Sequence, residues 1–297
     1  MHPYAKIFVA IDFSTGSDEA LRQAHERASS TGAKLAVCHI IPNELRSNLL
    51  FPHLSRAAAL EVPAETQRAS DAVANHIEKI TGLSRDDVTI LVDHGTPYAE
   101  ILKAAESWKA DLIVIGSHGM TSSAGVLLGS VTHKIIRSAH AAVLVVRKTG
   151  PGAIVAGTDF SDPALPAIEA AVAESRRTNR ALTVVHSIDL VFPAATHAGL
   201  GFGAPIPPLT DADYAALKQA AHDRLRQALK KFGASGETLV VMGPAGPALV
   251  ATAKNLNAGL LVVGTIGLTG LSRMLLGSVA DAAASEANCS VLITRLH

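Results

Sequence analysis

The chain alternates between short apolar runs and longer amphipathic segments, and the whole alternation occurs twice along its 297 residues. Runs of about four to eight residues rich in Val, Ile and Leu, bounded by Gly, Pro, Asp or Ser, predict buried strands. The segments between them carry Ala and Leu three and four residues apart, which predicts helices with one buried face. Strands that alternate with helices in this way indicate a parallel, doubly wound α/β sheet.

In the first half, the apolar runs predict strands at residues 6–11, 35–41, 88–92, 112–115 and 142–146. Helices are expected at residues 17–31, about 65–80, 98–107 and 130–138. Asp18 and Glu19 open the first of these helices, Gly32 follows it, and Pro97 stands at the first turn of the third. Residues 42–63 contain prolines at 42, 52 and 63, so we expect them to form a less ordered excursion.

After a linker at residues 148–152, the same order of elements returns. Strands are expected at residues 154–156, 182–186, 238–241, 260–263 and 290–294, and helices at 213–232 and 248–255. The excursion becomes residues 187–210, which are rich in Gly and Pro. An internal repeat of this length predicts two domains, residues 1–148 and 153–297, each large enough to bury its own core.

Two glycine-rich stretches at equivalent places carry the candidate chemistry. Residues 116–130 read GSHGMTSSAGVLLGS and residues 264–278 read GTIGLTGLSRMLLGS, so both space their glycines as G-x2-G-x9-G-S. Each stretch follows a buried strand and leads into a helix, where free backbone N–H groups and the helix dipole form an anion site. Glycine lets a phosphate approach the backbone closely. The stretches predict two nucleotide-phosphate cradles, with a plain strand-to-helix turn as the alternative.

An Asp-Phe-Ser sequence follows the first strand of each half. In an open parallel sheet, ligands bind beyond the carboxyl ends of the strands where the winding direction reverses. If the first and fourth strands are neighbours there, Asp12 faces the first glycine stretch and Asp159 faces the second. Such a carboxylate can accept a hydrogen bond from one end of a nucleotide while the glycines hold its phosphates. The alternative for both residues is capping of the following helix.

Composition narrows the function classes. The formal net charge is zero, so electrostatics make no case for nucleic acid or a membrane surface. Cys38 and Cys289 lie in or beside apolar runs, and we expect core thiols in a reducing cytosol. The opening MHPYAKIFVAIDFS has no signal-peptide hydrophobic region, and no apolar run approaches the ~20 residues of a membrane span. We therefore expect a soluble, cytoplasmic protein.

Both halves resemble the universal stress protein family. The matching residues are VAIDFS at 9–14, VAGTDFS at 155–161, His39 and His186 near the ends of the second strands, and both G-x2-G-x9-G-S stretches. The resemblance implies two tandem five-stranded parallel sheets of order 3-2-1-4-5, flanked by helices and Rossmann-like. It also implies ATP, ADP or AMP in the crevice of each, allows Mg²⁺, and implies that the domains pair through the edge strands 142–146 and 290–294.

The resemblance assigns nucleotide contacts residue by residue. Asp12 and Asp159 are placed near the adenosine, the backbone at Ile40 and Ser187 near the adenine, and Gly116 and Gly264 beside the ribose. Gly119, Gly129 and Ser130, and likewise Gly267, Gly277 and Ser278, are placed at the phosphates. The complete expected set is Ala10, Asp12, Ile40, Gly116, Gly119, Gly129, Ser130, Val131, Gly157, Asp159, Ser187, Gly264, Gly267, Arg273, Gly277, Ser278 and Val279.

The two stretches differ in one respect that bears on affinity. The second has Arg273, which can neutralise phosphate charge or lie solvated at the surface, where the first has Gly125. The first site is therefore expected to bind more weakly.

Other candidate residues carry less. His118 lies inside the first stretch, but the second has Ile266 there, so we interpret it as a loop histidine rather than a base. His39 and His186 are expected to pack or to hydrogen-bond to the backbone. Neither a His-x3-His pair nor a Cys/His cluster indicates a metal site. A nucleophile-elbow motif and a Gly-Lys-Ser/Thr Walker sequence are also absent, which argues against an efficient NTPase.

These observations predict a nucleotide-binding regulatory module of the stress response. A slow ATPase or phosphotransferase is one alternative, and an interaction protein with vestigial sites is another, including one that takes an apolar ligand at residues 199–208. Nucleotide is expected to order the glycine stretches and both excursions, which are candidates for a lid or a surface for an unidentified protein partner. Homodimerisation of the whole chain remains open.

Overall fold

The computed structural model describes residues 4–42, 52–119, 128–147, 150, 152–189, 209–265 and 276–295. Its first half contains β1 (Lys6–Ile11), α1 (Thr15–Thr31), β2 (Lys34–Pro42), α2 (Pro52–Thr81), β3 (Thr89–Gly95), α3 (Pro97–Trp108), β4 (Leu112–Gly116), α4 (Ser130–Ser138) and β5 (Ala142–Val146). A short 3-10 turn, Arg85–Asp87, precedes β3. The elements follow the predicted order.

The second half repeats this order. It contains β6 (Ile154–Gly157), α5 (Leu165–Thr178), β7 (Leu182–Ile188), α6 (Asp211–Lys231), β8 (Glu237–Met242), α7 (Ala245–Asn255), β9 (Leu260–Gly264), α8 (Ser278–Glu286) and β10 (Ser290–Thr294). A 3-10 turn, Asp162–Ala164, leads into α5. The repeat seen in the sequence is therefore a repeat of structure.

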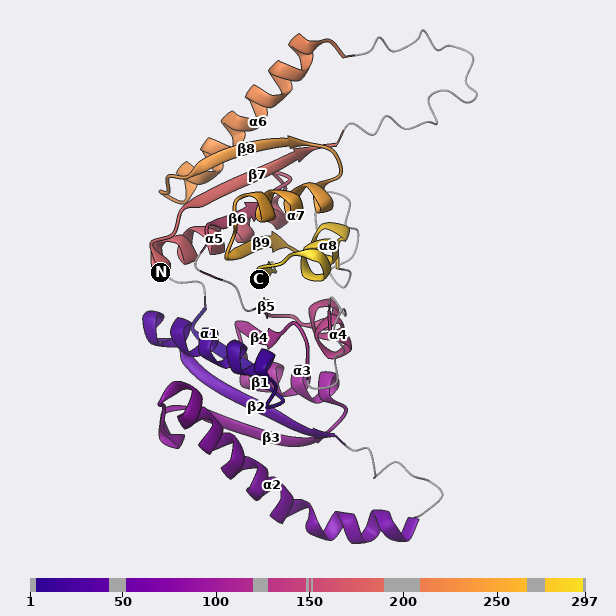
Figure 1. Cartoon of the computed structure of the whole chain (residues 1–297). Helices are drawn as coiled ribbons and strands as arrows, with labels where there is room; N and C mark the ends of the chain where they lie inside the picture. Colours follow the sequence, from indigo (N-terminus) through magenta and orange to yellow (C-terminus); the bar gives the residue numbers. More distant parts are fainter. Residues whose placement is uncertain are drawn as a thin grey trace, which may run out of the picture.

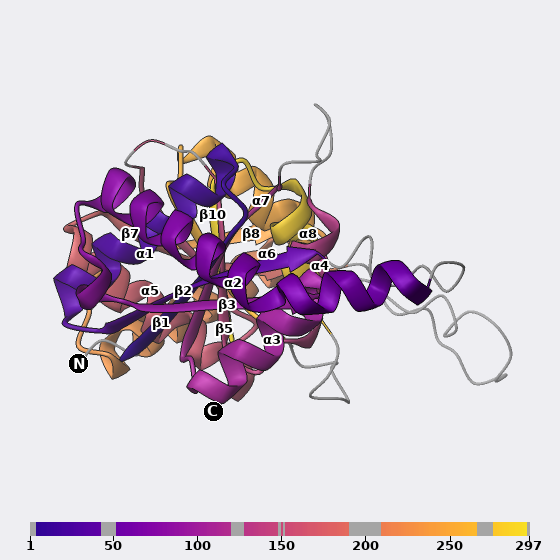
Figure 2. The same ribbon diagram turned by 90° about the horizontal axis from the view of Figure 1, so that it is seen from below.

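All the strands belong to one ten-stranded sheet of order β3-β2-β1-β4-β5-β10-β9-β6-β7-β8. Each half supplies five parallel strands in the order 3-2-1-4-5, as predicted. The halves join where β5 pairs with β10 in antiparallel fashion, as expected for the edge strands. In Figure 1, β3 and α2 lie at one end of the molecule and β8 and α6 at the other; in Figure 2, seen from below, β3 and α2 lie in front.

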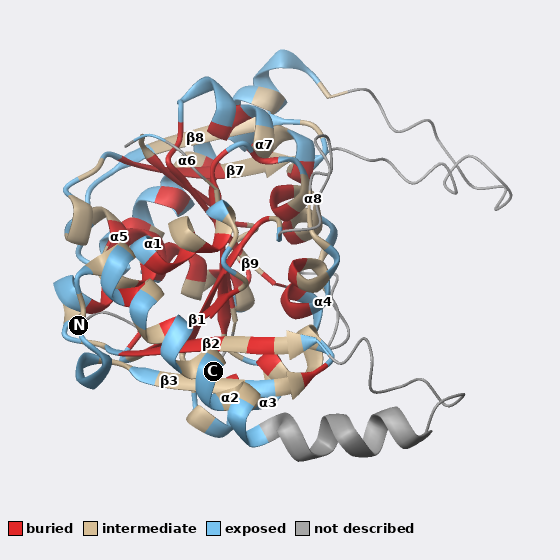
Figure 3. Cartoon of the chain, turned by 60° about the horizontal axis from the view of Figure 1, so that its bottom comes forward, coloured by how far each residue is buried: buried red, intermediate tan, exposed pale blue. Residues whose placement is uncertain are grey.

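The sheet has a buried core on each face. On one face, α1, α2, α5 and α6 pack Leu21, Ile77, Ile168 and Leu225 against the strands. On the other face, α3, α4, α7 and α8 pack a second set that includes Ile135 and Leu249. Figure 3 shows the central strands buried between these helices. Since both faces are covered, the central strands are apolar throughout, which explains the unbroken runs in the sequence.

Most boundaries agree with the predicted ones to within a few residues, but α2 does not. Its helix begins at Pro52, not near residue 65, and carries Pro63 inside it. Residues 52–63 were expected to be part of a loosely ordered excursion, because an interior proline removes one backbone hydrogen bond and clashes with the preceding turn. The sequence RAAALE at 56–61 explains the difference, since it consists of strong helix formers.

The start of α6 differs by two residues from the predicted one. The helix begins at Asp211, because Thr210 and Asp213 form a capping box in front of it. The Asp213 amide donates to the Thr210 hydroxyl at 3.2 Å, and the Thr210 amide donates to the Asp213 carboxylate at 2.8 Å. Asp213, where the sequence predicts the helix to start, is therefore the third residue of α6.

Both cysteines are free and buried, as expected for core thiols. Burial raises the pKa of the Cys38 thiol to about 12, so it stays protonated at neutral pH. Among the described residues, every helix is too short or too polar to cross a membrane.

Candidate nucleotide-binding sites

Both candidate sites lie where the winding of the sheet reverses. β1 pairs with β2 on one side and β4 on the other, and β6 stands between β7 and β9 in the same way. The carboxyl ends of these neighbouring strands are the usual place for a ligand in an open parallel sheet. Asp12 follows β1 there and Asp159 follows β6.

Asp12 is held by the residue that caps the next helix. Its Oδ1 accepts hydrogen bonds from the Ser14 amide at 3.1 Å and the Ser14 hydroxyl at 2.5 Å. The Ser14 Oγ in turn accepts from the Ser17 amide at 3.2 Å, so Ser14 is the N-cap of α1. Direct capping by Asp12, the alternative considered above, is therefore wrong: Asp12 orients the cap.

The glycines of the first stretch pack where a side chain has no room. A Cβ built on Gly119 would lie 2.6 Å from the Asp12 Oδ2, so the backbone of this glycine runs directly against the carboxylate. A Cβ on Gly116 would lie 2.9 Å from backbone atoms of Gly16, at the start of α1. The sequence prediction that Asp12 faces this stretch is confirmed at Gly119.

The stretch returns to the same point before α4 begins. The Gly129 amide donates to the Ser117 carbonyl at 2.8 Å, which closes the loop at its base. Gly129 is the N-cap of α4 and has no side chain to satisfy the amides of the first turn, whereas Ser130 at the helix start is exposed. A helix N-terminus of this kind presents backbone donors and a positive dipole end to an anion.

The second half repeats this geometry. The Asp159 Oδ1 accepts from the Ser161 amide at 3.0 Å and the Ser161 hydroxyl at 2.5 Å. The Gly277 amide donates to the Thr265 carbonyl at 2.7 Å, and Gly277 is the N-cap of α8. Because the two halves differ in sequence and still agree, these contacts belong to the shared fold.

The other expected residues lie around this framework. Ala10 and Gly157 are buried within β1 and β6, Ile40 is buried near the end of β2, and Ser187 is near the end of β7 and donates to the Gly243 carbonyl at 2.5 Å. Gly264 ends β9, and Ser278 opens α8. Val131 and Val279 pack their side chains against the core. Gly267 and Arg273 lie outside the described residues.

An aromatic ring follows each aspartate, and the sequence reasoning gave it no role. Phe13 and Phe160 both adopt a left-handed φ of 63°, which residues other than glycine rarely take. Their rings lie against the strand-end histidines, with centroids 4.8 Å apart for Phe13 and His39 and 4.2 Å apart for Phe160 and His186. The repeated Asp-Phe-Ser and strand-end His were the available signal.

Those histidines also hydrogen-bond to the backbone. The Nδ1 of His39 lies 3.0 Å from the Ile11 carbonyl oxygen, and the Nδ1 of His186 lies 2.9 Å from that of Thr158. The expected packing and backbone hydrogen bond are both confirmed.

The two halves cover these rings differently. His76 of α2 meets the Phe13 ring edge-on at 5.1 Å and lies 2.7 Å from the Asp18 carboxylate. Arg224 of α6 instead lies 4.2 Å over the Phe160 ring, as a cation–π contact. Sequence patterns do not show which helix residue reaches a ring so far along the chain, so both contacts were missed.

His118 is part of the first loop. Its Nδ1 lies 2.9 Å from the Ser117 hydroxyl. Desolvation, and secondarily the charge of Arg147, lower the pKa of the His118 imidazole, so the ring is neutral at pH 7. Among the described residues, no cluster of three or more His, Cys, Asp or Glu could hold a metal ion.

The geometry places two matched loop-and-helix sites in one sheet, and comparison with known proteins gives them a family. The model of the universal stress protein family matches residues 3–147 and again residues 152–295. The chain belongs to the universal stress protein family. It contains two universal stress protein units in tandem, which form an intramolecular pair through β5 and β10.

Relatives of both lengths are known. A universal stress protein of Mycolicibacterium smegmatis is 28% identical over 299 residues, which cover 97% of this chain and 96% of its own. A solved universal stress protein from Archaeoglobus fulgidus has a TM-score of 0.63 at 19% identity and covers 98% of each chain, which shows the fold. A further universal stress protein, whose structure is solved in complex with cAMP, is 30% identical over 49% of this chain and 98% of its own, with a TM-score of 0.33.

Proposed function

We propose that the chain binds an adenine nucleotide, ATP or else ADP or AMP, once in each half, and acts as a regulatory module of the stress response. The observation that carries this proposal is the contact of Asp12 with Gly119, in a glycine loop that leads into α4, a helix without a side-chain cap. In the second half, Asp159 follows β6 as Asp12 follows β1, and α8 also begins after a glycine N-cap. Membership of the universal stress protein family supports the same function.

The proposed roles follow from what each group can donate or accept. The carboxylates of Asp12 and Asp159 are proposed as acceptors for the adenosine, each oriented by the serine two residues further on. The backbone at Ile40 and Ser187 is proposed to meet the adenine. Ala10 and Gly157 of the strands, and Val131 and Val279 of the helices, complete the walls.

The phosphates are assigned to the amides of the glycine loops and helix starts. In the first half these are Gly119, Gly129 and Ser130, with Gly116 beside the ribose. In the second half they are Gly267, Gly277 and Ser278, with Gly264 beside the ribose and Arg273 as a further cation. Mg²⁺, when bound with ATP, would supply charge neutralisation at the phosphates, where the exposed hydroxyls of Ser130 and Ser278 are the nearest protein oxygens that we assign.

The chain is proposed to consist of a first domain at residues 1–148 and a second at residues 153–297. The proposed location is the cytoplasm, which suits two free buried thiols. Slow ATP hydrolysis by the same sites, and a role as an interaction protein with vestigial sites, are the competing functions.

The test is a calorimetric titration of nucleotide-free protein with Mg-ATP, followed by ADP, AMP and cAMP. Two sites per chain are expected, and Asp12→Asn or Asp159→Asn should each remove one of them. Asp86→Asn, which changes an exposed carboxylate near β3, is the matched control and should leave both. Absence of binding by all four nucleotides would overturn the proposal and favour the interaction protein, and phosphate release during the titration would favour the ATPase.

A further inference from the structure

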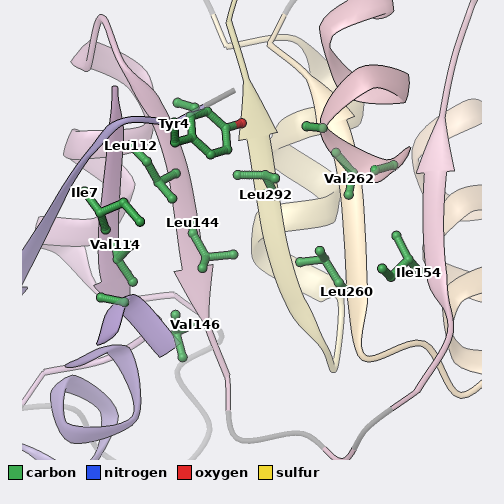
Figure 4. Packing of buried hydrophobic residues seen from close by; sticks show 14 of the residues in the cluster. Tyr4, Ile7, Leu112, Val114, Leu144, Val146, Ile154, Leu260, Val262 and Leu292 are labelled. Atoms are coloured by element: carbon green, nitrogen blue, oxygen red, sulfur yellow. The ribbon is translucent and has the colours of Figure 1, made fainter. Parts of the chain in front are cut away.

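The two halves meet along a seam, formed by β5, β10 and the helices that flank them. Leu144 of β5 stands directly opposite Leu292 of β10, and each is the middle residue of its strand (Figure 4). These two residues are equivalent in the repeat. A pseudo-twofold axis therefore passes between them, and a residue close to this axis meets its own counterpart from the other half.

Away from the axis, each contact occurs twice, once from each half, and an arginine is the donor both times. Arg147 follows β5 and donates to carbonyl oxygens at the end of α8 and before β10. Arg295 follows β10 and donates to the equivalent carbonyls at the end of α4 and before β5. The four acceptors are Ala284, Cys289, Ile136 and Ala141. Because each of these contacts joins two positions that are not equivalent in the repeat, both halves can carry an arginine at the same position.

At positions on this axis, the two halves carry side chains of opposite chemical character, one basic and one acidic. Arg27 of α1 and Glu174 of α5 occupy equivalent positions, since the offset that separates Asp12 from Asp159 also separates these two residues. The Arg27 guanidinium donates to the Glu174 carboxylate at 3.2 Å, with side chains only 6% and 2% exposed. α1 and α5 pack on the same face of the sheet, and Figure 1 shows them one in each half.

The opposite face of the sheet repeats this arrangement. His133 of α4 and Asp281 of α8 are equivalent, since each is the fourth residue of the helix that follows the glycine cap. The His133 Nε2 lies 3.5 Å from the Asp281 Oδ1, and both side chains are nearly half exposed. The second half thus carries an acid at both axial positions, where the first half carries a base.

A third ion pair across the seam runs the other way, with its base in the second half and its acid in the first. Arg177 of α5 reaches the Glu26 carboxylate of α1 at 3.0 Å and the Glu174 carboxylate at 2.9 Å. The residues at the equivalent positions are Ser30 and Ala173, so this contact has no mirror copy. It needs one half of each kind.

We propose that the Arg27–Glu174 ion pair, together with Asp281 opposite His133, makes the seam selective: these residues allow a first half to pair with a second half and oppose pairing of two like halves. Two first halves in this geometry would place Arg27 against Arg27, and two second halves would place Glu174 against Glu174. Like charges that face each other at a buried position are unfavourable, and in a pair of second halves the Arg177 of the same helix, 2.9 Å from Glu174, offsets only part of that cost. The partner that fits either edge strand is then a half of the other kind, which the same chain supplies.

The test changes the charge at one axial position while keeping its bulk. In the full chain, Arg27→Lys, Arg27→Gln and Arg27→Glu range from positive through neutral to negative, and Arg27→Glu reproduces the charges of a pair of second halves. The measurement is hydrogen exchange of the β5 and β10 amides, with β1 and β2 amides as the internal standard for folding. The same three changes at Arg22, which is exposed and pairs with Glu19 of its own helix, are the matched control.

Selectivity by charge predicts a graded result. Exchange at the seam should accelerate only slightly for Lys, more for Gln, and by at least about a hundredfold for Glu, while the internal standard stays protected. The series at Arg22 should leave the seam unchanged. Equal acceleration by Gln and Glu would show that Arg27 acts only through packing, and wild-type exchange in the Glu variant would show that its charge is irrelevant; either result overturns the proposal.

The second axial pair keeps the test decisive if Arg27→Glu does not fold. His133 is nearly half exposed, so His133→Lys, His133→Gln and His133→Glu spare the core. The same order is expected, with about a two- to threefold acceleration for Glu, because an exposed pair is weaker than a buried one. A flat series at His133 would overturn the role of this pair.

Discussion

At the residue scale, one short motif links the helix cap to the candidate site. Ser14 satisfies the first turn of α1 through its hydroxyl oxygen and also donates that hydroxyl to Asp12. Ser161 donates to Asp159 in the same way. Because one hydroxyl performs both tasks, local folding and the orientation of the carboxylate depend on the same atom.

Replacing that hydroxyl should therefore affect stability and binding together. We expect Ser14→Ala to lower the free energy of unfolding by about 1 kcal/mol through loss of the N-cap. It should also weaken nucleotide binding at the first site, since Asp12 loses a donor. Urea unfolding and calorimetry on the same samples measure the two effects. Ser14→Thr, which keeps the hydroxyl, is the control; if Ala and Thr behave alike in both assays, the hydroxyl has no such double role.

His118 yields a prediction about pH. Its folded pKa lies below the ordinary value of about 6.5, so the unfolded chain binds a proton more readily. The stabilising contribution of the neutral ring is present above that value and is lost as the pH falls through the folded pKa. Between pH 7.5 and 5, the wild type should therefore lose more stability than His118→Gln. Denaturant unfolding at both pH values tests this, and equal losses would contradict it.

At the element scale, α2 departs furthest from what its sequence indicates. Pro63 lies inside the helix, where it provides no amide for the hydrogen bond to the preceding turn. The long helix packs Val73 and Ile77 into the core and also carries His76 to Phe13. The packing of Val73 and Ile77 holds the part of α2 after Pro63 in place, and the helical turn before Pro63 extends from this packed part.

Restoring the missing hydrogen bond should strengthen the helix locally. Pro63→Ala is expected to stabilise the turn around residue 63 by up to about 3 kcal/mol, since the ring clash is removed as well. Amides near residues 63–67 should exchange more slowly, and the far-ultraviolet helical signal should rise. Pro52 is the first residue of α2, where proline is tolerated. Pro52→Ala is therefore the control without effect, and equal changes in both variants would contradict the interpretation.

These elements also show what the sequence can predict. The bounds of α4 and β5 could be predicted to the residue, because Gly129 and the apolar run 142–146 mark them sharply. Asp12 could be placed against Gly119 from the rule that ligands bind where the winding reverses. The left-handed Phe13 and the contact of Arg224 with Phe160 could not, since neither leaves a local signal in the sequence.

At the scale of the whole molecule, the seam turns two repeats into one sheet. Each half would otherwise expose an apolar edge strand, which is a hazard for association with other chains. β5 and β10 remove both edges by pairing with each other, and Val143, Leu144, Val291 and Leu292 are fully or almost fully buried as a result. Within the sheet, only β3 and β8 have one strand neighbour each.

The paired arginines test how evenly the two halves contribute. Arg147 holds the carbonyl end of α8 and Arg295 holds that of α4, so each half secures a helix of the other. Arg147→Ala and Arg295→Ala should each lower the free energy of unfolding by about 1.5–3 kcal/mol, as expected for hydrogen bonds from a charged group.

The symmetry predicts nearly equal losses, and it also predicts more than additive damage in the double variant, since both arginines hold the same seam. Urea unfolding of the two single variants and the double variant measures this, with the exposed Arg226→Ala, whose partner Asp223 lies on the same helix, as the control. A large loss in only one single variant would show that one half holds the seam alone. Strictly additive losses would show that the two helices are secured independently of each other.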